Sequence, residues 1–200
     1  MQDFKSFSEK VENLKSENFE NLALEIFEFQ AKHNSIYSAY LKARKIDPKK
    51  INSLESIPFL PIRFFKDFPI VSGPLDQFEG FFSSSGTTGM ITSKHYFWSE
   101  DWYLQQAQKT FEQEYGELKD FHVLALLPAY LERKGSSLVS MAAHFIEKSG
   151  SEHSGFYLYN HDELLQKLKL LSKDSKKVLL LGVTFALLDL AEKKEEFPQL

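Results

Sequence analysis

The spacing of hydrophobic residues predicts helices through about residue 67. Ser16 and Asn34 are each followed by apolar residues at helical intervals, so each is a candidate helix N-cap. The apolar faces comprise Phe19, Leu22, Ile26, Phe27 and Phe29 in the first helix, and Ile36, Tyr37, Tyr40 and Leu41 in the second. Segment 1–67 is therefore expected to be a helical part of the protein whose helices serve for packing.

The pattern changes in the second half of the chain. After a helical stretch that starts at Ser99 and stops at Gly116, short apolar runs alternate with helical patterns. The runs are 121–127, 156–159 and 178–181, and the helical patterns begin near Ser136, Asn160 (with Glu163 as a capping box) and Thr184. Strands that alternate with helices predict a mainly parallel sheet. The expected fold class is α/β, with the helical segment 1–67 followed by a domain of βαβα units over 68–200.

One loop in this domain has a composition that indicates chemistry. Phe81 and Phe82 suit the end of a strand, and seven consecutive small or hydroxylated residues, 83–89, follow them. Lys94 then opens a second β-like run through Trp98. The loop is therefore expected to connect two strands.

The residues of this loop are those of a phosphate-binding loop. Gly86 and Gly89 can adopt positive φ, which lets the backbone N–H groups approach an anion closely. The hydroxyl donors beside them are Ser84, Ser85, Thr87 and Thr88. A flexible Ser/Gly linker is the alternative, since such a linker has the same composition.

Two common nucleotide-binding motifs are excluded by spacing. A Walker A loop requires a Gly-Lys dipeptide, and the chain contains none. A dinucleotide fingerprint requires three glycines in a Gly-x-Gly-x-x-Gly pattern, whereas this loop has only Gly86 and Gly89.

In a parallel sheet, ligands bind beyond the carboxyl ends of the strands, so the residues after each apolar run are candidate site residues. Ser136 and Ser137 follow the first run at a predicted helix N-terminus, which favours an anion or a carboxylate. Ser136 as a simple N-cap is the equal alternative. Gly182 follows the last run, where a glycine permits close backbone approach, and Thr184 is a candidate cap.

Composition limits the remaining function classes. The chain has 200 residues and a net charge of −4, which gives no electrostatic indication of nucleic-acid binding. It has no cysteine, so it supplies neither a disulfide nor a thiol of its own. His144 and Glu147 have metal-ligand spacing, but two ligands do not make a site, and no metal site is predicted. The absence of a targeting signal or an apolar run of about 18 residues predicts a cytoplasmic protein without a membrane span.

The segment Ser84–Gly89, Ser-Ser-Gly-Thr-Thr-Gly, resembles the signature loop of the adenylate-forming enzymes, a superfamily that includes acyl-CoA synthetases. The superfamily usually continues with x-Pro-Lys, whereas here the lysine is delayed to Lys94. Two further segments, Leu127-Pro128 and 182–184, resemble the superfamily's strand ends. Together with the segment 57–66, Ile-Pro-x-Leu-Pro-x-x-Phe-Phe-Lys, the pattern is most similar to the acyl-protein synthetases of LuxE type.

The resemblance implies an acid–thiol ligase that uses ATP and Mg²⁺. A fatty or aryl acid would form an acyl-adenylate, and the acyl group would pass to a thiol on a protein, CoA or a carrier, with a reductase or transferase as a further partner. The residues implied for the phosphates are Ser84, Ser85, Gly86, Thr87, Thr88, Gly89 and Lys94, and those for the acyl side are Tyr130, Ser136, Ser137 and Gly182. No catalytic residue is assigned.

Several segments of that family have no counterpart in the chain, among them the acid that holds the ribose and the acyl-accepting cysteine. The chain is therefore expected to be the N-terminal part of a longer adenylate-forming enzyme and to form no acyl-adenylate alone. Two alternatives stay open: a noncatalytic nucleotide- or acyl-binding subunit, and an aryl- or acyl-CoA ligase of the phenylacetate-CoA ligase type.

Overall fold

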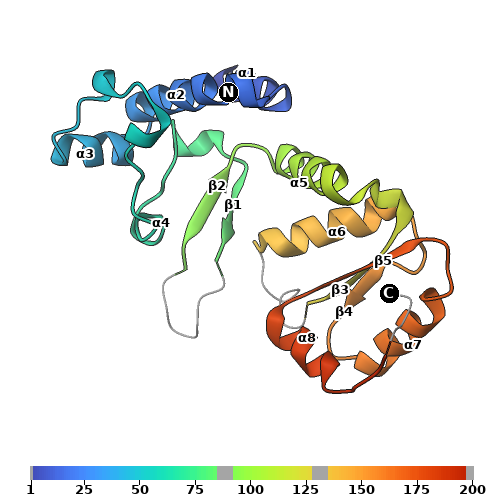
Figure 1. Ribbon diagram of the computed structural model, residues 1–200. Coiled ribbons are helices and arrows are strands. Elements are labelled where there is room, and N and C mark those ends of the chain that lie inside the picture. The colour runs from blue at the N-terminus through green and yellow to red at the C-terminus, as the bar shows by residue number, and fades with distance from the viewer. Residues whose placement is uncertain (1, 85–91, 128–134, 197–200) are drawn as a thin grey trace. The chain divides into compact units, whose positions relative to one another are not determined.

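The computed structural model describes residues 2–84, 92–127 and 135–196 (Figure 1). The chain forms two compact units, Met1–Glu100 and Asp101–Leu200, and each is described by itself. The sequence suggests a boundary near residue 67, where the predicted helical segment ends. None of the helices in the described ranges is long and apolar enough to cross a membrane.

The first unit begins with helices, as the hydrophobic pattern predicts. They are α1 (Gln2–Glu12), α2 (Ser16–His33), α3 (Ser35–Ala43) and the short α4 (Phe64–Asp67), with single 3₁₀ turns η1 (Pro48–Lys50), η2 (Leu54–Ser56) and η3 (Leu75–Gln77). Phe27 and Ala31 of α2 pack against Tyr37 and Leu41 of α3 in one buried cluster. These helices therefore bury their apolar faces against each other.

The two predicted caps of these helices have different outcomes. Asn34 is confirmed, because its side-chain oxygen accepts a hydrogen bond from the Tyr37 backbone N–H at 3.0 Å. Ser16 is wrong as an N-cap, since it is the first helical residue of α2. Lys15 precedes the helix, and its backbone N–H donates to Asn18 Oδ1 at 2.7 Å.

A two-stranded antiparallel sheet completes the first unit. Strands β1 (Gly80–Ser83) and β2 (Lys94–Phe97) pair in the register Gly80 with Phe97 through Ser83 with Lys94. The prediction that the Ser/Thr/Gly loop connects two strands is confirmed. Phe82 is buried, but Phe81 is 40% exposed, so this is not the fully buried strand end that the aromatic pair suggests.

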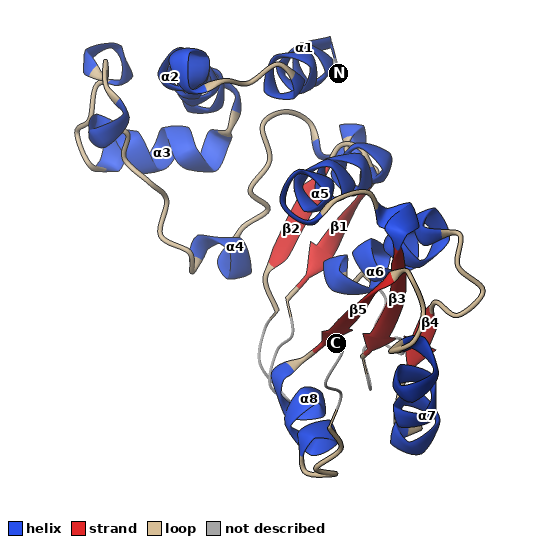
Figure 2. Ribbon diagram, turned by 45° about the vertical axis from the view of Figure 1, so that its right-hand side comes forward, coloured by secondary structure: helices blue, strands red, loops and turns tan. Residues whose placement is uncertain are grey.

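The second unit contains the predicted parallel sheet, with order β4-β3-β5 (Figure 2). The strands are β3 (Phe121–Leu126), β4 (Gly155–Tyr157) and β5 (Lys177–Gly182), and both outer strands run parallel to β3. Every residue of β3 is buried, which is expected for a central strand covered on both faces.

Helices cover both faces of this sheet. Alternate residues of β3 point to opposite sides, so Val123 and Leu124 enter different clusters. Val123 packs with α5 (Glu100–Tyr115), η4 (Leu118–Asp120) and α6 (Ser137–Ser149), whereas Leu124 packs with α7 (His161–Leu171) and α8 (Thr184–Ala191). The α/β class is therefore confirmed, as a three-layer arrangement.

The N-caps predicted for the helices of this unit are confirmed only in part. Ser136 caps α6, with its hydroxyl accepting from the Val139 N–H at 3.4 Å. The capping box at Asn160 is wrong, because the Asn160 amide donates to the Glu163 carboxylate at 2.6 Å and makes no cap bond with the helix backbone. Thr184 is also wrong as a cap, since it is the first residue of α8 and Val183 precedes the helix.

Candidate functional site

The predicted phosphate loop is bounded on both sides by the neck of the β1–β2 hairpin in the first unit. The Ser84 backbone N–H donates to the Ser93 carbonyl, and the Ser93 N–H donates to Ser84 Oγ, each at 3.0 Å. These two bonds extend the ladder beyond the last paired residues of β1 and β2. The Ser84 hydroxyl therefore accepts within the neck and keeps its own O–H to donate.

Two cationic or titratable side chains flank this neck. Lys94 is exposed, and its Nζ lies 4.7 Å from the centroid of the Phe81 ring, within the range of a cation–π contact. His95 contacts Ser93 Oγ through Nε2 at 3.2 Å and stacks on Phe65 of α4 with ring centroids 4.8 Å apart. The neck thus offers a positive charge and hydroxyl groups on adjacent positions.

The other predicted loop residues lie outside the described residues: Ser85, Gly86, Thr87, Thr88 and Gly89, and also Tyr130 of the acyl side. Their roles stay predictions. Among the predicted phosphate ligands, the structure describes Ser84 and Lys94 and brings both to the neck of the hairpin.

The remaining acyl-side residues belong to the second unit, at the carboxyl edge of its sheet. Ser136 acts as the cap of α6, and the Ser137 carbonyl accepts from the Tyr103 hydroxyl at 3.2 Å. Gly182 pairs with Leu126, and a Cβ built on it would lie 2.8 Å from Leu187 Cδ2 and 3.2 Å from the Leu126 carbonyl oxygen. Internal packing thus accounts for this glycine without a ligand.

An apolar pocket of the first unit was not predicted. Its volume is about 790 Å³, within the range of small-molecule sites. Its walls come from α1, α2, α3, α4, the segment 54–60, the segment 70–78 and β2. The aromatic-rich connector between residues 57 and 68 contributes Phe59 and Phe65 to this lining.

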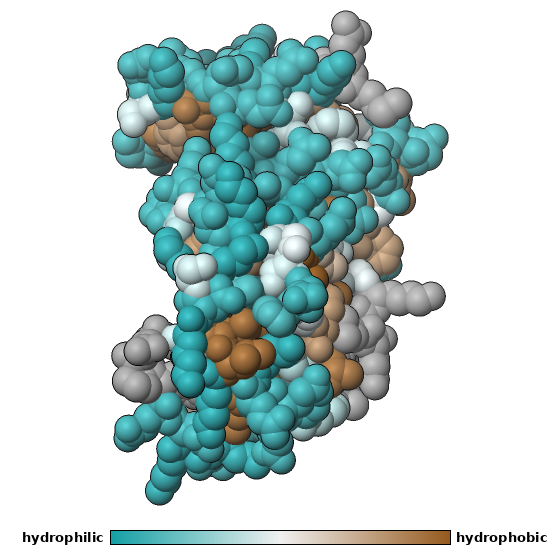
Figure 3. All heavy atoms as spheres, turned by 90° about the vertical axis from the view of Figure 1, so that its right-hand side faces the viewer, coloured by the Kyte–Doolittle hydropathy of each residue, from teal (hydrophilic) through white to brown (hydrophobic). Residues whose placement is uncertain are grey.

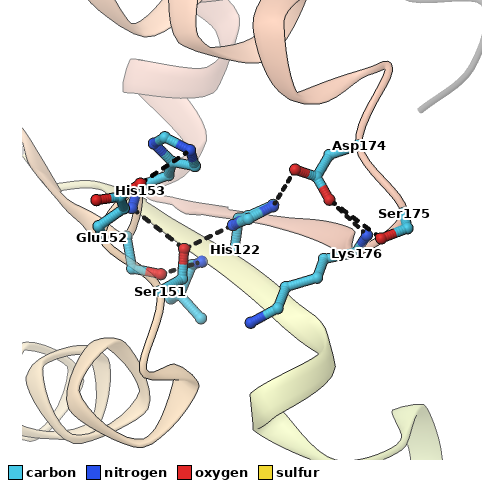
Figure 4. Close-up of polar contacts among 9 residues, drawn as sticks. His122, Ser151, Glu152, His153, Asp174, Ser175 and Lys176 are labelled. Atoms are coloured by element: carbon cyan, nitrogen blue, oxygen red, sulfur yellow. Dashed lines mark hydrogen bonds and ion pairs between the residues drawn. The ribbon is translucent and has the colours of Figure 1, made fainter.

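A polar cluster surrounds His122 at the amino end of β3 (Figure 4). His122 is only 3% exposed, and its Nδ1 lies 2.6 Å from Ser151 Oγ. Its Nε2 faces Asp174 Oδ2 at 3.6 Å, beyond hydrogen-bonding distance. Serine, histidine and aspartate in this order invite comparison with a hydrolytic triad.

The surroundings of these side chains indicate a structural role instead. Burial lowers the pKa of His122, and the Lys176 backbone N–H lowers the pKa of Asp174 by hydrogen bonding, so a neutral ring faces a carboxylate. Ser151 Oγ also accepts from the His153 N–H at 3.1 Å, which holds it within a turn. The cluster lies at the edge of the sheet opposite to the one where ligands bind.

Comparison with known proteins gives a partial match. The chain is 33% identical over 69 residues to the long-chain-fatty-acid--luciferin-component ligase of Photorhabdus luminescens. The matched stretch covers 34% of this chain and 59% of that protein. No family model matches the chain.

Proposed function

We propose that this protein takes part in the ATP-dependent activation of a carboxylic acid, with long-chain fatty acids as the preferred class, and in transfer of the acyl group to a protein thiol. The observation that carries the proposal is the Ser/Thr/Gly run Ser84–Gly89 at the end of a hairpin whose neck is closed by two hydrogen bonds. The similarity to a fatty-acid ligase of P. luminescens supports it.

The first step requires positioning and charge neutralisation more than side-chain chemistry. A carboxylate oxygen attacks the α-phosphorus of ATP, the bond to the bridging oxygen breaks, and pyrophosphate leaves. Each hydrogen bond to a charged phosphate oxygen contributes roughly 1.5–3 kcal/mol, so three or four bonds from the loop suffice to hold a triphosphate. Ser84 to Gly89 would supply these donors.

Magnesium would enter with the nucleotide. No group of three or more His, Asp or Glu side chains within the described ranges is arranged to hold a metal ion. Mg²⁺ is commonly held by substrate phosphates, water and one or two carboxylates, so a preformed cage is not required. The ion would neutralise the charge of the leaving pyrophosphate.

The second step needs a thiol from elsewhere. A thiolate attacks the acyl carbonyl carbon of the adenylate, and AMP leaves as the carbon–oxygen bond breaks. The chain has no cysteine. The acceptor thiol is therefore outside these 200 residues, on a protein cysteine, CoA or a carrier.

ATP–pyrophosphate exchange tests the proposal on the protein as its gene encodes it. Exchange should be stimulated by hexadecanoate, and replacing Ser85 and Thr88 with alanine should abolish it while leaving the melting temperature nearly unchanged. A matched double variant, Ser38→Ala with Thr110→Ala, removes two exposed hydroxyls from helices and should retain exchange. ATP binding without exchange under any acid would contradict activation and favour a noncatalytic nucleotide-binding subunit.

A further inference from the structure

The apolar pocket of the first unit has a composition that suits a long alkyl chain. We propose that it binds the hydrocarbon chain of a long-chain carboxylic acid, with the carboxylate at Lys94 beside the hairpin neck. This inference rests on the proposed function for the identity of the acid. It assigns the acyl chain to the first unit, whereas the sequence suggested Ser136, Ser137 and Gly182 of the second.

The walls of the pocket are mainly aromatic and aliphatic. Phe27 and Tyr37 form one side, with ring centroids 6.0 Å apart, and Phe78 and Trp98 contact Phe4 at another. Apart from the aromatic residues, the polar residues in the lining are Gln30, Asn34 and Ser72. The Asn34 side-chain oxygen is already occupied by the cap of α3. Such a lining favours an alkyl chain over a polar ligand.

The rim of the pocket exposes apolar side chains to solvent. Phe59 is 81% exposed and Phe19 is 49% exposed, and both line the pocket. The face drawn in Figure 3 is mainly hydrophilic, with a few hydrophobic patches. Exposed rings also occur elsewhere in the chain, for example at Tyr159 and Phe185, so what distinguishes Phe19 and Phe59 is their place at the pocket. A ligand that covers them would remove apolar area from water.

One strand connects the pocket to the hairpin neck. Tyr96 and Trp98 of the β2 segment line the pocket, and Lys94 lies two residues before Tyr96, on the same face of the strand. Tyr96 contacts Phe81 at 5.5 Å between ring centroids, and Lys94 Nζ lies over that same Phe81 ring. At about 3.4 Å per residue, the lysine backbone is roughly 7 Å from that of the pocket wall. A cation at one end of an apolar pocket matches an amphipathic acid.

A second set of contacts leads to the same neck from α4. Phe65 lines the pocket and stacks on His95, whose Nε2 meets Ser93 Oγ. Ser93 in turn bonds with Ser84 at the start of the predicted phosphate loop. A carboxylate bound at Lys94 would therefore lie beside the residues proposed to hold ATP, as attack on the α-phosphate requires.

Binding of the fluorescent fatty acid cis-parinaric acid to the 200-residue chain, without ATP, tests the proposal. Hexadecanoate should displace the probe, and Phe59→Glu should weaken probe binding at least tenfold because it places an anion at the apolar rim. Phe59 is too exposed for this change to unfold the protein. Leu75→Glu, a 50% exposed residue of the same unit outside the pocket lining, is the matched control and should bind normally.

The carboxylate position is tested by charge. Lys94→Gln should weaken hexadecanoate binding about two- to fivefold, as expected for an ion pair open to solvent, and should leave binding of hexadecanol unchanged. Lys94→Arg, which keeps the positive charge, should restore the tighter binding of hexadecanoate relative to hexadecanol. Equal affinity for the acid and the alcohol in the native chain would overturn the role of Lys94.

The results of these binding experiments can be distinguished from the result of the ATP–pyrophosphate exchange that tests the proposed function. Normal probe binding by Phe59→Glu, or no binding by the native chain, would overturn the pocket assignment even if acid-dependent exchange is observed. If the native chain binds the probe, Phe59→Glu abolishes this binding, and the encoded protein shows no ATP–pyrophosphate exchange, the pocket assignment is supported and the proposed ligase activity is contradicted.

Discussion

Replacing Gly182 with alanine separates a packing role of this residue from a ligand-binding one. The new Cβ would lie 2.8 and 2.9 Å from Leu187 side-chain carbons and 3.2 Å from the Leu126 carbonyl oxygen. Overpacking of this kind costs about 1–3 kcal/mol. Because φ at Gly182 is not positive, alanine also gains about 0.4–1 kcal/mol from a less flexible unfolded chain. The expected net loss of unfolding free energy is about 1–2 kcal/mol.

Urea denaturation measures this loss, and a second substitution identifies its cause. With a slope of about 2 kcal/mol per molar urea, in the middle of the usual range, the midpoint should fall by roughly 0.5–1 M. In a Leu187→Ala background the two closest contacts are gone and only the contact with the Leu126 carbonyl oxygen remains, so Gly182→Ala should cost clearly less. An equal loss in both backgrounds would refute the packing explanation. Unchanged stability together with lost acid-dependent exchange would show that Gly182 faces the acyl group after all.

Other substitutions test local interactions by the same denaturation. Burial lowers the folded-state pKa of His122 below the unfolded value near 6.5, so the unfolded state binds more protons as pH falls below 6.5. Stability should therefore fall from pH 6.5 toward 5, and less steeply in His122→Gln; an unchanged slope would contradict this. Asn34→Ala should cost about 1 kcal/mol and Asn34→Ser much less, because serine also caps. Ser154→Ala should cost about 1–3 kcal/mol by leaving the buried Val123 N–H without its 2.8 Å partner, whereas the exposed Ser175→Ala should cost nothing measurable.

Helices and strands could be predicted from the sequence where their apolar residues recur at a regular helical spacing or form one continuous run. The run 121–127 became the central strand because every residue in it can be buried, and Asn34 was found because a cap depends on neighbours within three residues. The caps at Asn160 and Thr184 failed for a local reason. Asn160 bonds with the Glu163 side chain, and α8 starts one residue earlier than a Thr184 cap requires.

Features that depend on distant segments could not be predicted. The apolar pocket joins residues as far apart as Phe4 and Trp98, each of which reads as ordinary core in its own segment. The predicted domain 68–200 contains the antiparallel pair β1 and β2 as well as the parallel strands. Only the pairing distinguishes them: β2 bonds to β1, and β3 bonds to β4 and β5.

The hairpin context changes the physical requirements on the predicted phosphate loop. Many phosphate loops lead into a helix whose N-terminus contributes both N–H donors and a favourable dipole. Here Thr92 and Ser93 lead directly into β2, so no helix N-terminus follows the loop at that side. If Lys94 holds the carboxylate, the phosphates must be held by the backbone N–H groups and hydroxyls of 84–89 and by Mg²⁺. ATP affinity should then depend steeply on Mg²⁺ and on each loop hydroxyl, and only weakly on Lys94.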